Sequence, residues 1–129
     1  NWREARRVGL RRGAYHFYHP TRDAQRQADH FIRRVALEPG DLAPVLDFEV
    51  INGGSERKVI DGLRIWLTAV EAHYGIRPII YTNAHLYEHY VKDHLPDYPL
   101  WIADYSNPHV ARYDANRLFL WQHNKSGRL

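Results

Sequence analysis

Two carboxylates separated by a single residue, Asp47 and Glu49, are the groups in this 129-residue chain best suited by type and spacing to chemistry. They lie in an apolar, β-prone run that opens with Pro44, which predicts a buried strand. Side chains two positions apart on a strand leave the same face, so both carboxylates point one way. Burying such a pair is costly unless the groups are paired or used. The pattern favours acid/base chemistry on a sugar bond, and the alternative is that the carboxylates cap helices or pair with arginines.

The elements around this pair alternate between strand and helix with short links, which predicts an α/β fold with a parallel sheet and helices outside it. Strands are expected over residues 13–18, 44–50, 78–82, 100–103 and 118–122. One helix ends before Gly9, and a second begins at the N-cap Thr21. The remaining helices run from the N-cap Ser55 to Gly75 and from the N-cap Asn83 to about Lys92.

Side chains able to bind or react gather at the ends of the predicted strands. Parallel sheets place their sites at the carboxyl ends of the strands. The residues found at or directly after such ends are Asp47, Glu49, Tyr81, Thr82, Asp104 and Tyr105. Their convergence predicts one site at this edge of the sheet.

The composition sets broad limits on the kind of protein. A hydrophobic content of 44% in 129 residues suits one domain with a real core. The absence of cysteine excludes disulfides and thiol catalysis. A net charge of +3 and a pI near 9.3 suit a polyanionic target such as a cell wall without requiring nucleic acid. No apolar run approaches the length that spans a membrane.

Five segments of the sequence occur in a characteristic order. They are Gly13-Ala14-Tyr15-His16-Phe17, Val45-Leu46-Asp47-Phe48-Glu49, Pro78-Ile79-Ile80-Tyr81-Thr82, Leu100-Trp101-Ile102-Ala103-Asp104-Tyr105 and Trp121-Gln122. Across essentially the whole chain this resembles glycoside hydrolase family 25, the Chalaropsis-type lysozymes. The resemblance implies an irregular TIM-like β/α barrel. It also implies a peptidoglycan hydrolase that cleaves the β-1,4 bond between N-acetylmuramic acid and N-acetylglucosamine.

The two ends depart from the family pattern. Family members usually begin with a strand bearing another active-site Asp and end with a Gly-rich segment that leads to a further Asp. The chain opens inside a predicted helix and stops at Gly127-Arg128-Leu129. We therefore expect residues 1–129 to be the central part of a single catalytic domain, with the barrel incomplete in this chain and an open sheet edge.

The same likeness assigns roles to the carboxylates. Glu49 matches the general acid, and its longer side chain reaches further into a cleft. Asp47 matches the carboxylate beside it and is expected to stay charged, either as nucleophile or as partner to the 2-acetamido group of the substrate. Because two neighbouring carboxylates resist ionising together, the pKa of one should rise. Two strand positions span about 6.6 Å, which lies between the retaining and inverting separations and leaves the stereochemistry open.

Four aromatic residues are candidates for stacking on sugars and hydrogen bonding to them, namely Tyr15, Tyr81, Trp101 and Tyr105. The alternative for each is an ordinary place in the core. The expected chemistry requires no metal and no cofactor.

Two other functions compete with this reading. His85, Glu88 and His89 match the H-x-x-E-H pattern of zinc peptidases, but the expected apolar face of their helix turns both histidines outward. A catalytically inactive cell-wall or carbohydrate-binding relative would keep the groove without the chemistry. The expected partner is a peptidoglycan glycan strand, met by a monomer outside the cytoplasm, whether secreted, periplasmic or delivered by a phage. Neither nucleic-acid binding nor membrane insertion is expected.

Overall fold

The structure, a computed structural model, describes residues 13–38, 40–103 and 118–122, the last of these as backbone only. The strands in this part of the chain are β1 (Tyr15–Phe17), β2 (Val45–Phe48), β3 (Ile79–Asn83), β4 (Leu100–Ala103) and β5 (Leu118–Gln122). The helices are α2 (Ala24–Arg34), α3 (Glu56–Tyr74), α4 (Ala84–Leu86) and the π-helix η1 (Tyr87–Val91). Within the described residues the predicted alternation of strand and helix is confirmed, and the helix predicted before Gly9 lies outside them.

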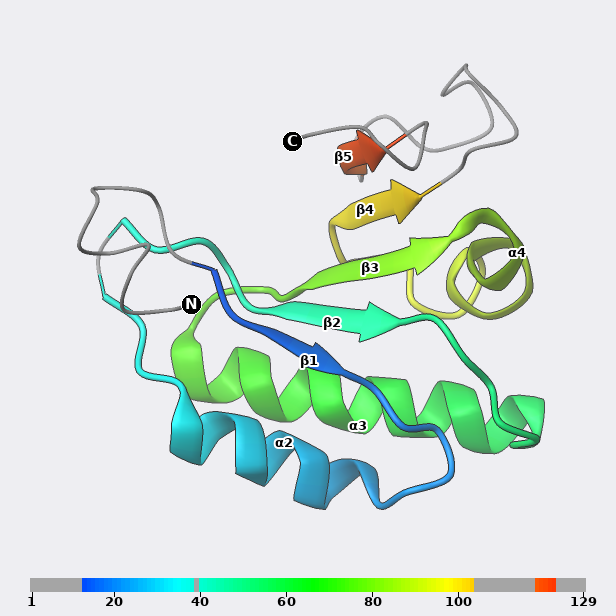
Figure 1. Ribbon diagram of the computed structural model, residues 1–129, viewed down its shortest axis with the longest axis horizontal. Helices are drawn as coiled ribbons and strands as arrows, with labels where there is room; N and C mark the ends of the chain where they lie inside the picture. Colours follow the sequence, from blue (N-terminus) through cyan, green and yellow to red (C-terminus); the bar gives the residue numbers. More distant parts are fainter. Residues whose placement is uncertain (1–12, 39, 104–117, 123–129) are drawn as a thin grey trace.

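The strands form one parallel sheet in the order β1-β2-β3-β4-β5, so that neighbours in sequence are neighbours in space (Figure 1). All five carboxyl ends therefore lie at one edge of the sheet. At that edge the Thr82 hydroxyl donates a buried 2.6 Å hydrogen bond to the Phe48 carbonyl, which ties the ends of β2 and β3 together. Within the described residues β1 and β5 do not pair with each other, so this part is an open stretch of a barrel.

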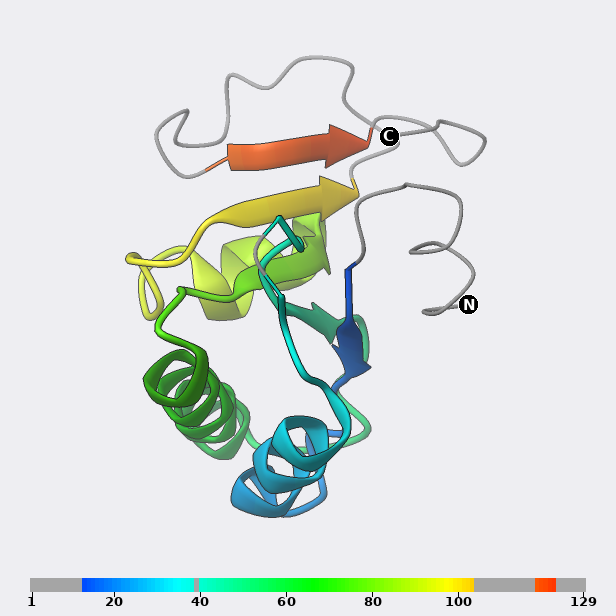
Figure 2. The same cartoon turned by 90° about the vertical axis from the view of Figure 1, so that its left-hand side faces the viewer.

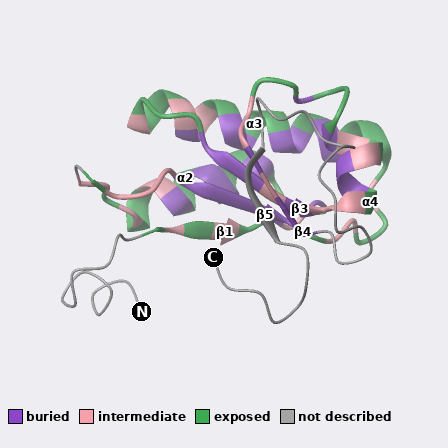
Figure 3. Cartoon of the chain, turned by 90° about the horizontal axis from the view of Figure 1, so that it is seen from above, coloured by how far each residue is buried: buried purple, intermediate pink, exposed green. Residues whose placement is uncertain are grey.

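One face of the sheet is covered by α2 and α3, which also pack against each other. Figure 2 shows both helices on the same side of the sheet after a quarter turn. Trp66 of α3 is fully buried at the centre of this layer, with its ring 5.3 Å from that of Phe31 and stacked 5.7 Å from that of His16. Alternate strand residues complete the core on this face, namely Leu46, Phe48, Ile80 and Ile102. Strand β1 is exposed or half-buried (Figure 3), whereas most residues of β2 and β4 are buried.

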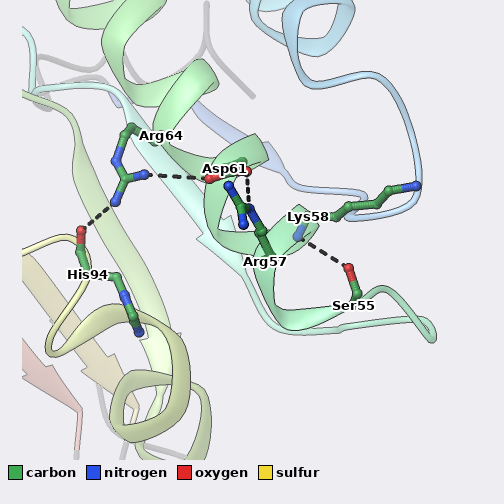
Figure 4. Close-up of polar contacts among 6 residues, drawn as sticks. All are labelled: Ser55, Arg57, Lys58, Asp61, Arg64 and His94. Carbon is green, nitrogen blue, oxygen red and sulfur yellow. Dashed lines mark hydrogen bonds and ion pairs between the residues drawn. The ribbon is translucent and has the colours of Figure 1, made fainter.

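The long helix α3 begins and ends where the sequence predicts. The Ser55 hydroxyl accepts a hydrogen bond from the Lys58 backbone N–H at 3.3 Å, and Gly75 closes the helix in the left-handed conformation at φ 72°. Arg64 donates to the backbone carbonyl of His94 at 3.0 Å and lies 3.6 Å from the Asp61 carboxylate (Figure 4). These contacts join α3 to the segment after η1.

A glycine in the middle of α3 has a structural reason. Gly62 lies against the hydroxyl of the buried Tyr18, which follows β1, and an added Cβ would collide with that hydroxyl. Glycine costs a helix interior about 1 kcal/mol relative to alanine. The close approach of the two elements explains why the chain carries it here.

The structure corrects the expected start of the second helix. Asp23, rather than Thr21, is the N-cap of α2, because its carboxylate accepts the Arg26 backbone N–H at 2.8 Å. The chain first makes a turn in which the Arg22 N–H bonds to the His19 carbonyl at 3.1 Å, and this turn delays the helix.

Two further elements differ in detail from the expectation. The segment after Asn83 starts with the predicted cap, whose side chain accepts the Leu86 N–H at 2.9 Å, but it widens into a π-helix after one α-helical turn. Strand β2 ends at Phe48, so Glu49 lies just beyond it. In the described part of the chain no helix is both long and apolar enough to cross a bilayer.

Candidate active site

Asp47 lies on the face of the sheet that α2 and α3 leave uncovered. Its strand neighbours in register are Phe17 on β1 and Tyr81 on β3, and Tyr81 is in turn paired with Trp101 on β4. Residues paired in a parallel sheet leave the same face, so these four side chains form a row across it. His16, one position earlier on β1, stacks on Trp66 and thereby marks the opposite face as the one the helices cover.

Two of the four predicted aromatic residues, Tyr81 and Trp101, are brought together in this row. The rings of Tyr81 and Trp101 lie 5.0 Å apart in an edge-to-face arrangement with an interplanar angle of 77°. Three buried side-chain atoms of the described residues lack a hydrogen-bond partner, namely Asp47 Oδ1, Trp101 Nε1 and Trp66 Nε1. The first two belong to this row, whereas Trp66 lies in the core on the other face. The row thus combines an acceptor, a donor and flat apolar rings.

Asp47 and Glu49 form a coupled pair although their surroundings differ. Asp47 is 9% exposed and its backbone carbonyl accepts the Tyr18 N–H at 2.9 Å, which fixes its place in the sheet. Glu49 is exposed beyond the end of β2. Burial raises the pKa of Asp47 to about 8, and the hydrogen bond and negative charge of Glu49 add to the rise. A buried carboxyl beside a second carboxylate resists ionising, so Asp47 keeps its proton well above pH 4.

The prediction that one pKa of the pair rises is confirmed, but the residue concerned was not foreseen. We expected Asp47 to keep its charge and Glu49 to hold the proton. The structure raises the pKa of Asp47 because this carboxyl lies within the sheet and loses more solvation.

The other predicted residues have different outcomes. Tyr15 pairs with Val45 one layer closer to the amino ends of the strands, and it is 70% exposed. Phe17 takes the place in the row beside Asp47 and is 38% exposed. The sequence offered one signal for Phe17, since it shares the strand face of Tyr15 and lies two positions nearer the carboxyl end. Asp104 and Tyr105 lie outside the described residues.

The zinc-peptidase pattern does not assemble a metal site in the described residues. His85 and His89 are exposed, as predicted, with ring centroids 4.4 Å apart. Glu88 lies 3.7 Å from the ammonium group of Lys92. Residues 13–38, 40–103 and 118–122 contain no group of three or more His, Cys, Asp or Glu side chains placed to hold a metal ion.

A parallel sheet whose strands follow one another in chain order, with connecting helices on one face, is the arrangement of a β/α barrel. The chain belongs to glycosyl hydrolases family 25, whose family model matches residues 1–129. The resemblance seen in the sequence is therefore confirmed, and the fold is part of a TIM-like barrel.

Known relatives support the assignment and show how much of them the chain covers. A family 25 glycosyl hydrolase from Bacillus anthracis superposes with a TM-score of 0.84 at 29% identity, over 100% of this chain and 61% of the other. The spore cortex lytic enzyme SleM from Clostridium perfringens gives 0.78 at 33% identity, over 98% and 48%. The protein YegX of Escherichia coli K12 is 34% identical over 129 residues, which are 100% of this chain and 47% of YegX. The chain thus spans about half the length of such curated relatives.

Proposed function

We propose that the protein is a peptidoglycan hydrolase, a muramidase that cleaves the β-1,4 bond between N-acetylmuramic acid and N-acetylglucosamine. Membership of family 25 and the likeness to a spore cortex lytic enzyme support this class of reaction. The observation that carries the proposal is the coupled pair of Asp47 and Glu49, set at the carboxyl edge of the sheet beside Tyr81 and Trp101.

The pair donates a proton to the leaving group, and its two carboxylates are then both negatively charged. Near neutral pH it holds one proton, because burial and mutual repulsion resist the second ionisation. Glu49 is exposed and reaches the leaving oxygen of the sugar bond, so the proton held by Asp47 passes to Glu49 and from Glu49 to that oxygen. Positive charge then develops on the anomeric carbon and stabilises the second negative charge that the pair acquires. Asp47, the deeper group, acts on that carbon as nucleophile or holds the 2-acetamido group that does.

The aromatic row holds the glycan in register with the carboxylates. The rings of Phe17, Tyr81 and Trp101 give flat apolar contacts for sugar rings, and the Trp101 Nε1–H donates to a hydroxyl or acetamido oxygen. Tyr15 and Tyr105 stay as proposed contacts with the glycan. The substrate lies in the cell wall, so the protein acts outside the cytoplasm, as a secreted, periplasmic or phage-delivered monomer without nucleic acid, membrane insertion, metal or cofactor.

The test is Glu49→Gln in the intact protein, which keeps the size of the side chain and removes its dissociable proton. Clearing of a wall suspension should slow by about 10²–10⁴-fold, the usual share of acid catalysis, while wall binding in a pull-down persists. His85→Ala, at an exposed position on α4, is the matched control and should change neither quantity.

Two results would contradict the proposal. Full lysis by the Glu49→Gln protein would remove that residue from the role of proton donor. A wild-type protein that binds walls without clearing them would instead be a catalytically inactive, carbohydrate-binding relative.

A further inference from the structure

A cavity lined by polar and charged side chains opens at the end of β1, where the chain turns into α2. Its volume is about 730 Å³, within the range of small-molecule sites. Three histidines, two arginines and one aromatic ring contribute to its lining: His16, His19, His30, Arg22, Arg26 and Phe17. The role proposed for Asp47 and Glu49 uses only Phe17 among them.

The side chains that line this cavity carry more positive than negative charge. Neither Arg22 nor Arg26 makes an ion pair with any residue in the described ranges. Asp23 is the one carboxylate in the described lining, and it is already engaged by the Arg26 backbone N–H as the cap of α2. The lining therefore carries two guanidinium groups against one carboxylate. Guanidinium groups bind carboxylates through paired, directional hydrogen bonds.

The wall of the cavity is held in place by a buried amide. The Gln27 side chain is 8% exposed; its oxygen lies 2.8 Å from His16 Nε2 and accepts the His19 backbone N–H at 3.0 Å. Its amide nitrogen donates to the His19 carbonyl at 2.9 Å. Gln27 thereby joins β1, the turn and α2 into one rigid frame. A site built on such a frame loses little conformational entropy when a ligand binds.

The position of the cavity relates it to the carboxylate pair. Phe17 lines the cavity and is also the neighbour in register of Asp47. Adjacent strands are about 4.8 Å apart, so the cavity opens one strand away from the site where the sugar bond would lie. Muramic acid carries a peptide with free carboxylates on its lactyl group. The free carboxylates of this peptide complement the guanidinium groups of the cavity.

We propose that this cavity binds a carboxylate of the peptide attached to muramic acid, with Arg22 and Arg26 as the binding groups. The inference rests on the proposed function, and it adds recognition of the peptide to recognition of the sugar. Removing both charges should weaken the binding of peptide-bearing glycan by about tenfold, and the loss should require free carboxylates on the ligand.

The experiment measures equilibrium binding without turnover. Two fluorescent muropeptides, one with free peptide carboxylates and one with amidated carboxylates, are titrated with the intact protein by fluorescence anisotropy. The variant is Arg22→Gln with Arg26→Gln, which keeps helix propensity and removes charge only. Arg57→Gln is the control, since Arg57 is an exposed arginine on α3, 3.8 Å from Asp61 and outside the cavity.

The wild-type protein should prefer the free carboxylates, and the double variant should lose that preference while Arg57→Gln retains it. Equal losses for both muropeptides, an unchanged affinity in the variant, or no binding by the wild-type protein would each overturn the proposal. Selective binding by a protein that never clears walls would contradict the proposed function and leave the assignment of the cavity supported.

Discussion

The two faces of the sheet differ in what their side chains have to do. The face towards α2 and α3 is closed by apolar and aromatic contacts around Trp66. The other face carries Asp47, the one charged residue among the buried side chains of the described residues, beside the rings of Tyr81 and Trp101. A buried carboxyl lowers stability unless it is paired or used. Successive side chains of a strand point to opposite faces. The same strands therefore supply the apolar core on one face and the proposed site on the other.

The largest effect on stability should come from the helix-covered face. Trp66→Ala removes a fully buried ring that contacts Phe31 and His16, and it should lower the free energy of unfolding by about 3–5 kcal/mol. Trp101→Ala on the other face should cost about 1 kcal/mol through the lost contact with Tyr81, yet weaken glycan binding. Urea unfolding of both variants checks the contrast, and equal losses of stability would remove it.

A smaller and opposite effect is expected at Asp47. Its pKa is about 8 in the folded protein and about 3.9 in an unfolded chain, so the free energy of unfolding falls as the pH rises from about 4 to about 8. Asp47→Asn has no proton to lose and escapes this fall. Because solvent reaches Glu49 and screens the pair, we expect a gain over wild type on the order of 2 kcal/mol at pH 8 and little change at pH 4.

Urea unfolding of the Asp47→Asn and wild-type proteins at the two pH values measures this difference. Wall lysis by the variant should fall by at least about 10²-fold, because the charge that stabilises the developing cation is lost. A variant that is less stable than wild type at pH 8 would show that the ionised carboxylate is well accommodated in the sheet.

A further effect on stability concerns the packing between the end of β1 and α3. Gly62→Ala should raise helix propensity but lower stability by about 1–3 kcal/mol, because the new methyl group meets the Tyr18 hydroxyl. Tyr18→Phe in the same protein removes that hydroxyl and should recover most of the loss. Thermal unfolding of the single and double variants tests the contact, and additive losses would show that the two residues do not interact.

Much of the fold follows from local sequence signals. Strands β4 and β5 have the bounds predicted from their apolar runs, and α3 has its expected cap at Ser55 and its end at Gly75. Each of these signals is strong by itself. The start of α2 was misplaced because Thr21 and Asp23 are both good N-caps, and only the turn at His19 decides between them.

The site depends on relations between elements that a sequence does not contain. Phe17 rather than Tyr15 lies beside Asp47 because the register between β1 and β2 places it there. The proton of the carboxylate pair favours Asp47 because the sheet buries this group and leaves Glu49 exposed. Spacing along the chain predicted the pair, and burial decided how its members differ.

The central claim is that Asp47 and Glu49 share a proton at the carboxyl edge of the sheet, and a carboxyl ¹³C NMR titration of Asp47 tests it most directly. In the wild-type protein the resonance should titrate near pH 8. In Glu49→Gln the midpoint should move down, because the charge and the acidic hydrogen bond are gone, but it should stay above the ordinary value because burial persists. A wild-type midpoint near 4, or one that Glu49→Gln leaves unchanged, would contradict the account.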